Sequence, residues 1–390
     1  MGYLYYYADI LNSTAFGNVQ GTSSVGGLLG QALIYNTITN ANANGWVSGT
    51  SRVGGLVGDV SNQSTTITNS AANNSVTGSF NNAGTTVYFG VRGSGSFVGG
   101  LVGYIRDSSI TGSSANTVVI GQSSDVGGLV GRMDSGASVT TSGSMGTVTG
   151  AGNVGGLVGS MYNYTSVSNS YANSNVTSSA NNAGGFVGYF ITTGNISNSR
   201  ASGSVTGASY VGGFIGAMAN TGGVSSSYAT GMVTASGSYV GGFLGYADTS
   251  ARTLQDFYAT GAVTGATIVG GLVGKADRGT FTNGYATGLI TGTSSVGATF
   301  GAVGTGTTVT GVSPNQTTTY WVIRNNLYYD STTTGMSTDA AGGGGTGSAT
   351  GLATASLLGT LPHANWLPGT WGTGTGLYPY LKSIYGSSAP

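Results

Sequence analysis

The side chains with the best spacing for acid–base chemistry are two aspartates on neighbouring repeats of the sequence. Asp107 and Asp134 follow two copies of a glycine-rich motif at nearly the same distance, and Arg106 and Arg132 lie beside them. A carboxylate pair can serve as general acid and base, as in glycoside hydrolysis. Aspartate is also a common turn residue, and the others are scattered about one per repeat. We favour the turn interpretation and predict no catalytic residue.

Other reactive groups are scarcer. The chain has one histidine, His363, beside Pro362, and no cysteine. A Ser-His-Asp triad would have to use His363. Disulfides and thiolate metal sites are excluded, the Ca²⁺-binding nonapeptide GGxGxD is absent, and no histidine cluster offers a metal site. The sequence therefore predicts no cofactor-binding or metal-binding residue and favours a protein that is not an enzyme.

These residues are carried by a repeated element, Val-Gly-Gly-Leu-Val-Gly, that recurs about every 28 residues. Exact or worn copies begin at Val25, Val53, Val98, Val126, Val154, Ala183, Val211, Val240, Val269 and Val296. A period of 20–50 residues is typical of stacked units that bury their apolar faces against their neighbours. The paired glycines precede strands and not helices, so they favour a bend or a close backbone approach over a phosphate-binding loop. The spacing predicts an all-β solenoid (β-helix) of about ten coils with an irregular C-terminal capping module.

Each repeat contains three short apolar segments separated by turn residues, which predicts three strands per coil. The Leu or Phe of the motif and the second residue after the motif are apolar in nearly every copy, so both should face the core. The first residue after the motif varies from Asp59 to Arg132 to Lys275 and should face solvent. We therefore expect Leu129→Asp to disrupt the array, whereas Arg132→Ala should change stability by about 0.5 kcal/mol or less.

Two other recurring positions each have a structural and a functional interpretation. An aromatic ladder that stabilises stacking is favoured over a stripe for sugar rings at Tyr171, Tyr228, Tyr258 and Tyr285. Outward threonines suggest an ice-binding array, but a single file is more often a row of β-forming residues on a solvated face. They lie in Gly-x-Val-Thr-Gly-like segments that begin at Gly45, Gly146, Gly203, Gly261 and Gly288.

Pattern breaks divide the chain into three parts. Residues 1–24 form a partial repeat at the N-terminal edge, and residues 25–312 form the solenoid. Extra residues within 81–96 suggest a projecting hairpin or loop, which is the best place to look for a specific contact. All five prolines lie beyond residue 312. The Trp- and Pro-rich residues 313–390 are therefore expected to cap the open strand edges.

Composition restricts the partners. The chain has 75 glycines, 5 % charged residues and a formal net charge of zero. It has no basic patch for nucleic acid or for anionic membranes. No apolar stretch reaches the ~18 residues of a membrane span. We expect neither nucleic acid nor a membrane span among its partners.

The motif and the segments that follow it resemble a known repeat. Val-Gly-Gly-Leu-Val-Gly with Asn-Ser-Tyr-Ala and Val-Thr-Gly after it is similar to the GLUG-motif repeats of bacterial surface proteins. Such repeats occur in filamentous-haemagglutinin-like adhesins and other large secreted β-solenoid proteins. The tail, with LYPYLKS from Leu377 to Ser383, looks like the segment that closes such arrays. The resemblance implies an extracellular, cell-surface protein with an adhesive or structural role.

Two functional hypotheses remain. The first is a non-catalytic surface protein, adhesive or structural, that contacts a cell-surface glycan or a receptor on a host or neighbouring cell and assembles end to end into a homo-oligomer or filament. The second is a carbohydrate-binding or carbohydrate-processing β-solenoid. Three or more Asp, Arg or Tyr side chains in one groove would favour the second, and scattered charges on smooth faces would favour the first.

Overall fold

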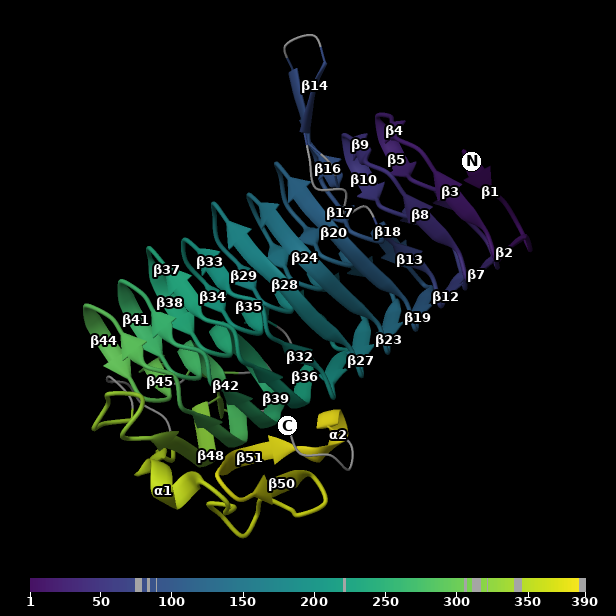
Figure 1. Cartoon of the computed structure of the whole chain (residues 1–390). Helices are drawn as coiled ribbons and strands as arrows, with labels where there is room; N and C mark the ends of the chain where they lie inside the picture. The colour runs from purple at the N-terminus through teal and green to yellow at the C-terminus, as the bar shows by residue number, and fades with distance from the viewer. Residues whose placement is uncertain are drawn as a thin grey trace.

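The chain folds into a β-solenoid whose coils follow one another in sequence order along a single stack (Figure 1). The computed structural model describes residues 1–73, 79–82, 85–88, 90–219, 222–304, 307–310, 317–320, 322–339 and 346–385. Neighbouring coils are joined by parallel strand ladders, so each coil satisfies its backbone groups on the coils before and after it. The predicted architecture is confirmed.

The motif copies lie in one column, a ten-stranded parallel sheet. Val98 pairs with Val53 on one side and with Val126 on the other, and the same register continues along the stack. The strands are β5 (Ser23–Gly26), β10 (Ser51–Gly54), β17 (Val98–Gly99), β21 (Val126–Gly127), β25 (Val154–Gly155), β29 (Ala183–Gly184), β34 (Val211–Gly212), β38 (Ser238–Gly241), β41 (Thr267–Gly270) and β44 (Ser294–Gly297).

The rest of each coil adds four parallel ladders that join into one 35-stranded sheet. The ladder after the motif holds β1 (Tyr3–Leu4), β6 (Leu29–Ala32), β11 (Val57–Val60), β18 (Val102–Arg106), β22 (Val130–Asp134), β26 (Val158–Tyr162), β30 (Val187–Ile191), β35 (Ile215–Ala219) and β45 (Phe300–Val303). The next holds β2 (Asp9–Leu11), β7 (Thr37–Thr39), β12 (Thr66–Thr68), β19 (Ser109–Thr111), β23 (Ser138–Thr140), β27 (Ser166–Ser168), β31 (Asn195–Ser197) and β36 (Gly223–Ala229). The long strands β39 (Leu244–Ala259) and β42 (Val273–Ala286) run through both ladders and continue, as β36 does, into the ladder that follows.

The last two ladders complete the coil. They hold β3 (Thr14–Phe16), β8 (Asn42–Asn44), β13 (Ala71–Ala72) and β32 (Arg200–Ala201), then β4 (Val19–Gln20), β9 (Val47–Gly49), β16 (Val91–Gly93), β33 (Val205–Gly207), β37 (Val233–Ala235), β40 (Val263–Thr264) and β43 (Ile290–Thr291). Three strands, β20 (Ser114–Gly121), β24 (Gly143–Gly150) and β28 (Tyr171–Ser178), run through both of these ladders. A coil thus has five short pairing segments, and the prediction of three strands per coil is wrong.

The extra break in the second predicted segment comes from a residue in the left-handed conformation. Asn69 and Asn169 have φ of 48° and 51°, a conformation that asparagine tolerates better than most residues. The residue after each bend is a buried serine. The Ser113 N–H donates to the hydroxyl of Ser142 in the next coil, and the Ser142 N–H donates to the hydroxyl of Ser170. The serine column therefore satisfies backbone donors that the bend turns away from the ladder.

The coil encloses two hydrophobic cores. The larger core contains Leu101, Val102 and Ile105, and the smaller core contains Val98 and Val119. The predicted inward positions are confirmed, and the second Val of the motif is buried as well. Leu101 and Val102 can both face inward because their N–H groups both reach the Leu129 carbonyl, at 2.8 and 3.0 Å, which breaks the strand alternation.

The two cores are separated by a column that consists of the second glycine of successive motif copies, such as Gly100 and Gly128. We term this column the glycine wall. A Cβ added to Gly100 would lie 2.0 Å from the Gly128 oxygen and 2.9 Å from the Cβ of Ala115. The second glycine of the motif therefore lets successive coils meet backbone to backbone and lets the Ala115 side chain of the facing strand approach closely. This contact explains both the recurring glycine and the small residue opposite it.

The insertion in the third coil is a hairpin that projects from the stack (Figure 1). It consists of β14 (Ser79–Asn82) paired antiparallel with β15 (Thr85–Tyr88). The predicted bounds, 81–96, are shifted, because Val91–Gly93 already pairs with Val47–Gly49 and with β20 as a regular part of the coil. The glycines and serines around Val91–Gly93 resemble a turn-rich loop, so the sequence alone did not reveal that these residues pair within the coil.

The C-terminal part has two components. Strand β48 (Val322–Asp330) pairs with β42 and carries β49 (Thr350–Leu352), so it extends the stack, and β46 (Thr307–Thr310) forms a hairpin with β47 (Thr317–Tyr320). The remainder, which we term the side module, contains α1 (Thr354–Leu357), β50 (Trp371–Gly374), β51 (Leu377–Leu381) and α2 (Lys382–Tyr385). It lies along a lateral face of the last coils and not across their end alone (Figure 1). Among the described residues no helix is long and apolar enough to cross a membrane.

Candidate functional site

The side chains on either side of each motif copy meet on the outside of the coil. The preceding and following residues contact each other as Arg52 with Asp59 and as Phe97 with Tyr104, and the same holds for the pairs Asp125–Arg132 and Tyr239–Tyr246. We term this line of side chains the corner groove. Its preceding members are Ser24, Arg52, Phe97, Asp125, Asn153, Asn182, Tyr210, Tyr239, Ile268 and Ser295, and its following members are Gln31, Asp59, Tyr104, Arg132, Ser160, Tyr189, Ala217, Tyr246, Lys275 and Ala302.

Glycines of the motif create the groove. A Cβ on Gly131, the last motif glycine, would lie 2.5 Å from the Gly103 oxygen and 2.6 Å from the Val98 nitrogen. The two sheets therefore touch through their backbones, and the flanking residues must diverge outward from the contact. The residue before the motif makes this turn in the left-handed conformation, with φ of 66° at Phe97 and 62° at Asp125.

The N-terminal section of the groove is an ion-pair network. The Arg52 guanidinium lies 2.6 Å from Asp59 Oδ2, the Gln31 amide donates to the same oxygen at 2.9 Å, and Arg52 covers the Tyr104 ring at 5.1 Å. Asp59 is fully buried. Burial raises the pKa of the Asp59 carboxyl, and the Arg52 charge and hydrogen bond oppose that rise.

The middle section is centred on Arg132. Its guanidinium pairs with Asp125 at 3.8 Å and Asp134 at 3.3 Å, and it lies over the rings of Tyr162 and Phe97 at 4.0 and 5.3 Å. The Arg132 side chain is only 25 % exposed and Asp125 is buried. The prediction that this position faces solvent is therefore wrong: the side chain leaves the core but is held inside the groove. The equivalent Asp59 and Ser160 are fully buried for the same reason.

The proposed acid–base pair is not assembled as a carboxylate pair. Asp107 lies in an exposed turn with φ of 46° and pairs with Arg106 at 3.3 Å. Asp134 pairs with Arg132 and accepts a hydrogen bond from the Asn163 amide at 2.8 Å. Each carboxylate thus has its own cation, an arrangement typical of structural ion pairs.

The remaining candidates are His363 and any cluster of metal-binding side chains. His363 Nδ1 accepts the Asn365 N–H at 3.0 Å in an exposed turn of the side module. Within the described ranges, no group of three or more His, Asp or Glu side chains is close enough to hold a metal ion.

The C-terminal section of the groove is rich in tyrosine. The rings of Tyr210 and Tyr239 stack at 5.0 Å, and Tyr246 meets them at 5.5 and 5.8 Å. The hydroxyl of Tyr246 donates to Asp277 Oδ2 at 2.7 Å, and Lys275 pairs with Asp277 at 3.0 Å. Burial, followed by the Asp277 carboxylate, raises the pKa of the Tyr246 phenol, which therefore stays protonated at neutral pH. This section contains a hollow of about 280 Å³, the tyrosine pocket, lined by Asn182, Tyr189, Tyr210, Ala217, Tyr239, Tyr246 and Lys275.

The aromatic ladder predicted in the second segment exists, but only its later members stack. Tyr228 and Tyr258 lie 4.7 Å apart with nearly parallel rings, and Tyr285 continues the stack at 4.9 Å. The side module covers all three, so they are not a surface for sugar rings. Tyr171 lies apart from them and is covered by the Arg200 guanidinium at 5.1 Å.

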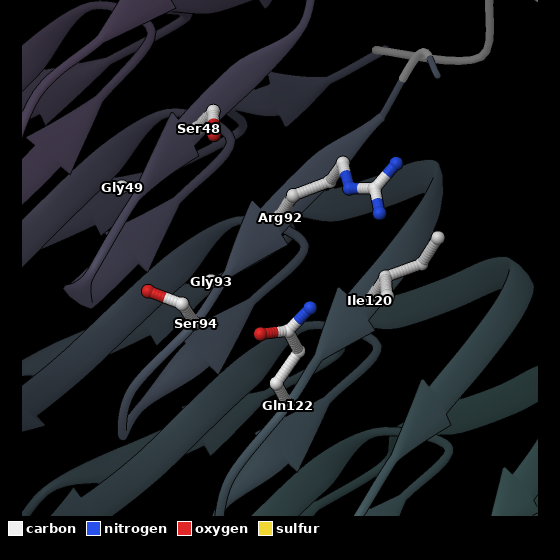
Figure 2. A pocket seen from close by; sticks show the side chains of 7 residues that line it. All are labelled: Ser48, Gly49, Arg92, Gly93, Ser94, Ile120 and Gln122. Atoms are coloured by element: carbon white, nitrogen blue, oxygen red, sulfur yellow. The ribbon is translucent and has the colours of Figure 1, made fainter. Parts of the chain in front are cut away.

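A second hollow, of about 150 Å³, lies beside the root of the projecting hairpin. Figure 2 shows the side chains of Arg92, Ile120 and Gln122 on neighbouring coils around it, with Gly49 and Gly93 leaving part of it bare. The outward threonine file of the later coils ends here, since Arg92 and Ile120 occupy the positions equivalent to Thr149. The file is a single row of threonines from Thr149 to Thr291, and no aromatic ring is among the residues that line this hollow.

Comparison with known families gives one match. The family model "The GLUG motif" matches residues 150–177 and 179–206. Residues 150–206 of the chain thus contain two repeats that match the GLUG motif. Comparison with curated proteins and with solved structures gives no significant match. The matched GLUG repeats pair in register with the coils on either side, as Val126 with Val154 and Ala183 with Val211, so the neighbouring coils share their geometry.

The sequence reasoning missed half of the groove. The residue after each motif copy was predicted to face solvent, whereas the residue before it was given no role. A signal was available, because Tyr210 and Tyr239 precede motif copies and Tyr189 and Tyr246 follow them. The structure brings these tyrosines together, which is the clustering set as favouring the second hypothesis, a carbohydrate-binding or carbohydrate-processing β-solenoid.

Proposed function

We propose that this chain is an extracellular surface rod that acts by adhesion and not by catalysis. GLUG repeats in a β-solenoid fit a surface or structural repeat protein. The observation that carries the proposal is the continuity of the corner groove across coils. Arg132 contacts Phe97 of the coil before it and Tyr162, which borders the groove in the coil after it, and Tyr162 contacts the groove member Tyr189 at 6.3 Å. Half-buried aromatic and polar side chains in a row suit recognition of an extended partner.

The adhesive role predicts that the chain mediates attachment through the groove. Beads coated with the chain should bind cell surfaces, and Tyr104→Ala with Tyr162→Ala should reduce binding. Thr206→Ala with Thr234→Ala, two residues paired on a different ladder, is the matched control and should bind normally. Equal loss from both pairs, or no binding by the unaltered chain, would contradict an adhesive groove.

The extracellular location and the lack of catalysis need separate measurements. An antibody against the chain should label intact producing cells without permeabilisation, and labelling only after permeabilisation would contradict the location. Reducing-end assays on a panel of polysaccharides should show no turnover. Turnover that Asp134→Asn abolishes would overturn the non-catalytic part of the proposal.

End-to-end assembly stays a prediction, and the unpaired strand edge of the first coil is the structural reason for it. Within the part of the chain that the structure describes, the strands β1–β4 pair with β6–β9 on one side only. An open edge of this kind accepts further strands, whether from the same chain or from another. Sedimentation over a range of concentrations should show association of the chain, and a monomer at all concentrations would refute it.

A further inference from the structure

We infer that the tyrosine pocket binds a neutral oligosaccharide chain. This inference rests on the adhesive function proposed above and assigns that function a ligand class. The pocket draws its lining from four successive coils, with Asn182 and Tyr189 in the first and Lys275 in the last. Its volume of about 280 Å³ is close to the lower end of the usual range for small-molecule sites, about 300 Å³.

The pocket is pre-organised without a ligand. Tyr210 and Tyr239 hold each other by stacking at an interplanar angle of 21°, and the Tyr246 hydroxyl is fixed by its bond to Asp277. Lys275 is fixed by the same carboxylate and lies 5.7 and 5.9 Å from the centres of the Tyr239 and Tyr246 rings. A site whose side chains are already ordered spends little conformational entropy on binding.

The chemistry of the lining matches a sugar. Aromatic faces carry a negative quadrupole, which attracts the weakly positive C–H face of a pyranose ring. The Tyr189 and Tyr210 hydroxyls, the Asn182 amide and the Lys275 ammonium can then donate to sugar oxygens around the rim, and the Tyr246 hydroxyl, which donates its proton to Asp277, can accept from a sugar hydroxyl. Successive coils rise by about 4.8 Å, which is close to the length of one hexose unit in an extended chain. Each coil can therefore meet a successive sugar unit.

The charge of the pocket favours a neutral ligand. Lys275 is the cation of the lining, and Asp277 neutralises it at 3.0 Å. An anionic sugar or a phosphate would have to compete with that carboxylate, and a cationic ligand would face Lys275. The nearby Asp248 is paired with Arg278 at 2.5 Å, so it does not change this balance.

The position of Ala217 supplies a sharp test. In the ladder Ala217 pairs with Tyr189 on one side and Tyr246 on the other, so tyrosine fits this position of the coil. Ala217→Tyr should leave the fold intact and fill the pocket. The other variants are Tyr239→Ala and Tyr246→Ala, with Tyr239→Phe as the conservative change. Tyr164→Ala is the control, because this tyrosine is 75 % exposed and lies outside the pocket on the coil before it.

Binding is measured by calorimetry on the full chain with cellohexaose, mannohexaose and maltohexaose, a heparin hexasaccharide and a proline-rich extended peptide. We expect at least one neutral hexasaccharide to bind. Ala217→Tyr, Tyr239→Ala and Tyr246→Ala should each weaken it tenfold or more, and Tyr239→Phe and Tyr164→Ala should not. Circular dichroism checks that each variant is folded. If an alanine variant is not folded, the result for Ala217→Tyr decides whether the pocket is the binding site.

Three results would overturn the inference: no neutral hexasaccharide binds at millimolar concentration, binding ignores Ala217→Tyr, or the heparin or peptide probe binds in its place. These failures are distinct from failure of adhesion. Beads that attach to cells without any oligosaccharide affinity would refute only the ligand class. Oligosaccharide binding by a chain whose beads do not attach would refute only the adhesive role.

Discussion

A methyl group added to Gly128 tests whether the glycine wall sets the geometry of the whole stack. Its Cβ would lie 2.0 Å from the Gly156 oxygen and 3.0 Å from the Cβ of Ser144. That oxygen also accepts the Ser144 hydroxyl at 2.6 Å, so it is fixed from the side as well as within its coil. The obstacle is backbone held by neighbouring ladders, and a real contact at 2.0 Å does not occur, so the coils must separate locally.

The expected cost follows from two opposing terms. Overpacking a well-packed interior costs about 1–3 kcal/mol, and the rigid obstacle at Gly128 places this site near the upper end. The loss of unfolded-chain entropy on Gly→Ala returns about 0.4–1 kcal/mol. The net destabilisation of Gly128→Ala is therefore about 2 kcal/mol, which corresponds to roughly a 30-fold change in the opening equilibrium.

Hydrogen exchange detects this change coil by coil, which suits a repeat array better than one melting temperature. Peptides covering residues 98–184 should exchange about 30-fold faster in Gly128→Ala, while distant coils should exchange as before. Gly369→Ala is the control, since its Cβ would meet nothing within 4 Å. Exchange of residues 98–184 that matches the unaltered chain would show that successive coils do not depend on the close backbone approach at Gly128.

Three further changes follow from the groove and the side module. Arg132→Ala removes the cation beside buried Asp125 and should lower the free energy of unfolding by about 2 kcal/mol. Arg106→Ala is the control, because its ion pair is about half exposed, and it should change the free energy of unfolding by less than about 0.5 kcal/mol. Urea titrations measure both changes. Trp371→Phe removes the indole donor 2.9 Å from the Asp256 carboxylate and should cost about 1–3 kcal/mol by the same assay, and an unchanged urea midpoint would contradict that bond. Burial raises the pKa of Asp125 above its ordinary value despite opposing hydrogen bonds, so the stabilisation from its protonation is present in acid and is lost as pH rises through the raised pKa. Asp125→Asn should flatten that part of the profile of stability against pH, and an identical profile would refute the assignment.

The solenoid could be predicted because its cause is repeated in the sequence. The spacing of the motif and the apolar identity of positions such as Leu129 and Met133 recur in every coil, and periodic burial needs no knowledge of distant contacts. The bulge at Leu101 and Val102 could not be read in this way, since an apolar pair at neighbouring positions fits several backbone paths.

The groove and the side module depend on contacts that no local pattern encodes. The groove exists because two sheets meet through glycine backbones, and that contact turns Phe97 and Asp125 outward in the left-handed conformation. The side module reaches far back along the chain, with the Tyr285 hydroxyl donating to the Pro379 carbonyl 94 residues later. Composition identified the change after residue 312 but not the face that these residues cover.

The side module also gives the rod two mechanical regions. Among the described residues, the coils before Tyr228 are joined only to their neighbours, so a pull on the N-terminal end would peel them one at a time and release up to about 95 Å of chain per coil. The module grips several coils at once, through Tyr385 on Tyr228, Trp371 on Asp256 and Trp366 on the Asn326 carbonyl. These coils must shear together before any one can open. These contacts predict that tension would lengthen the first region and leave the second intact.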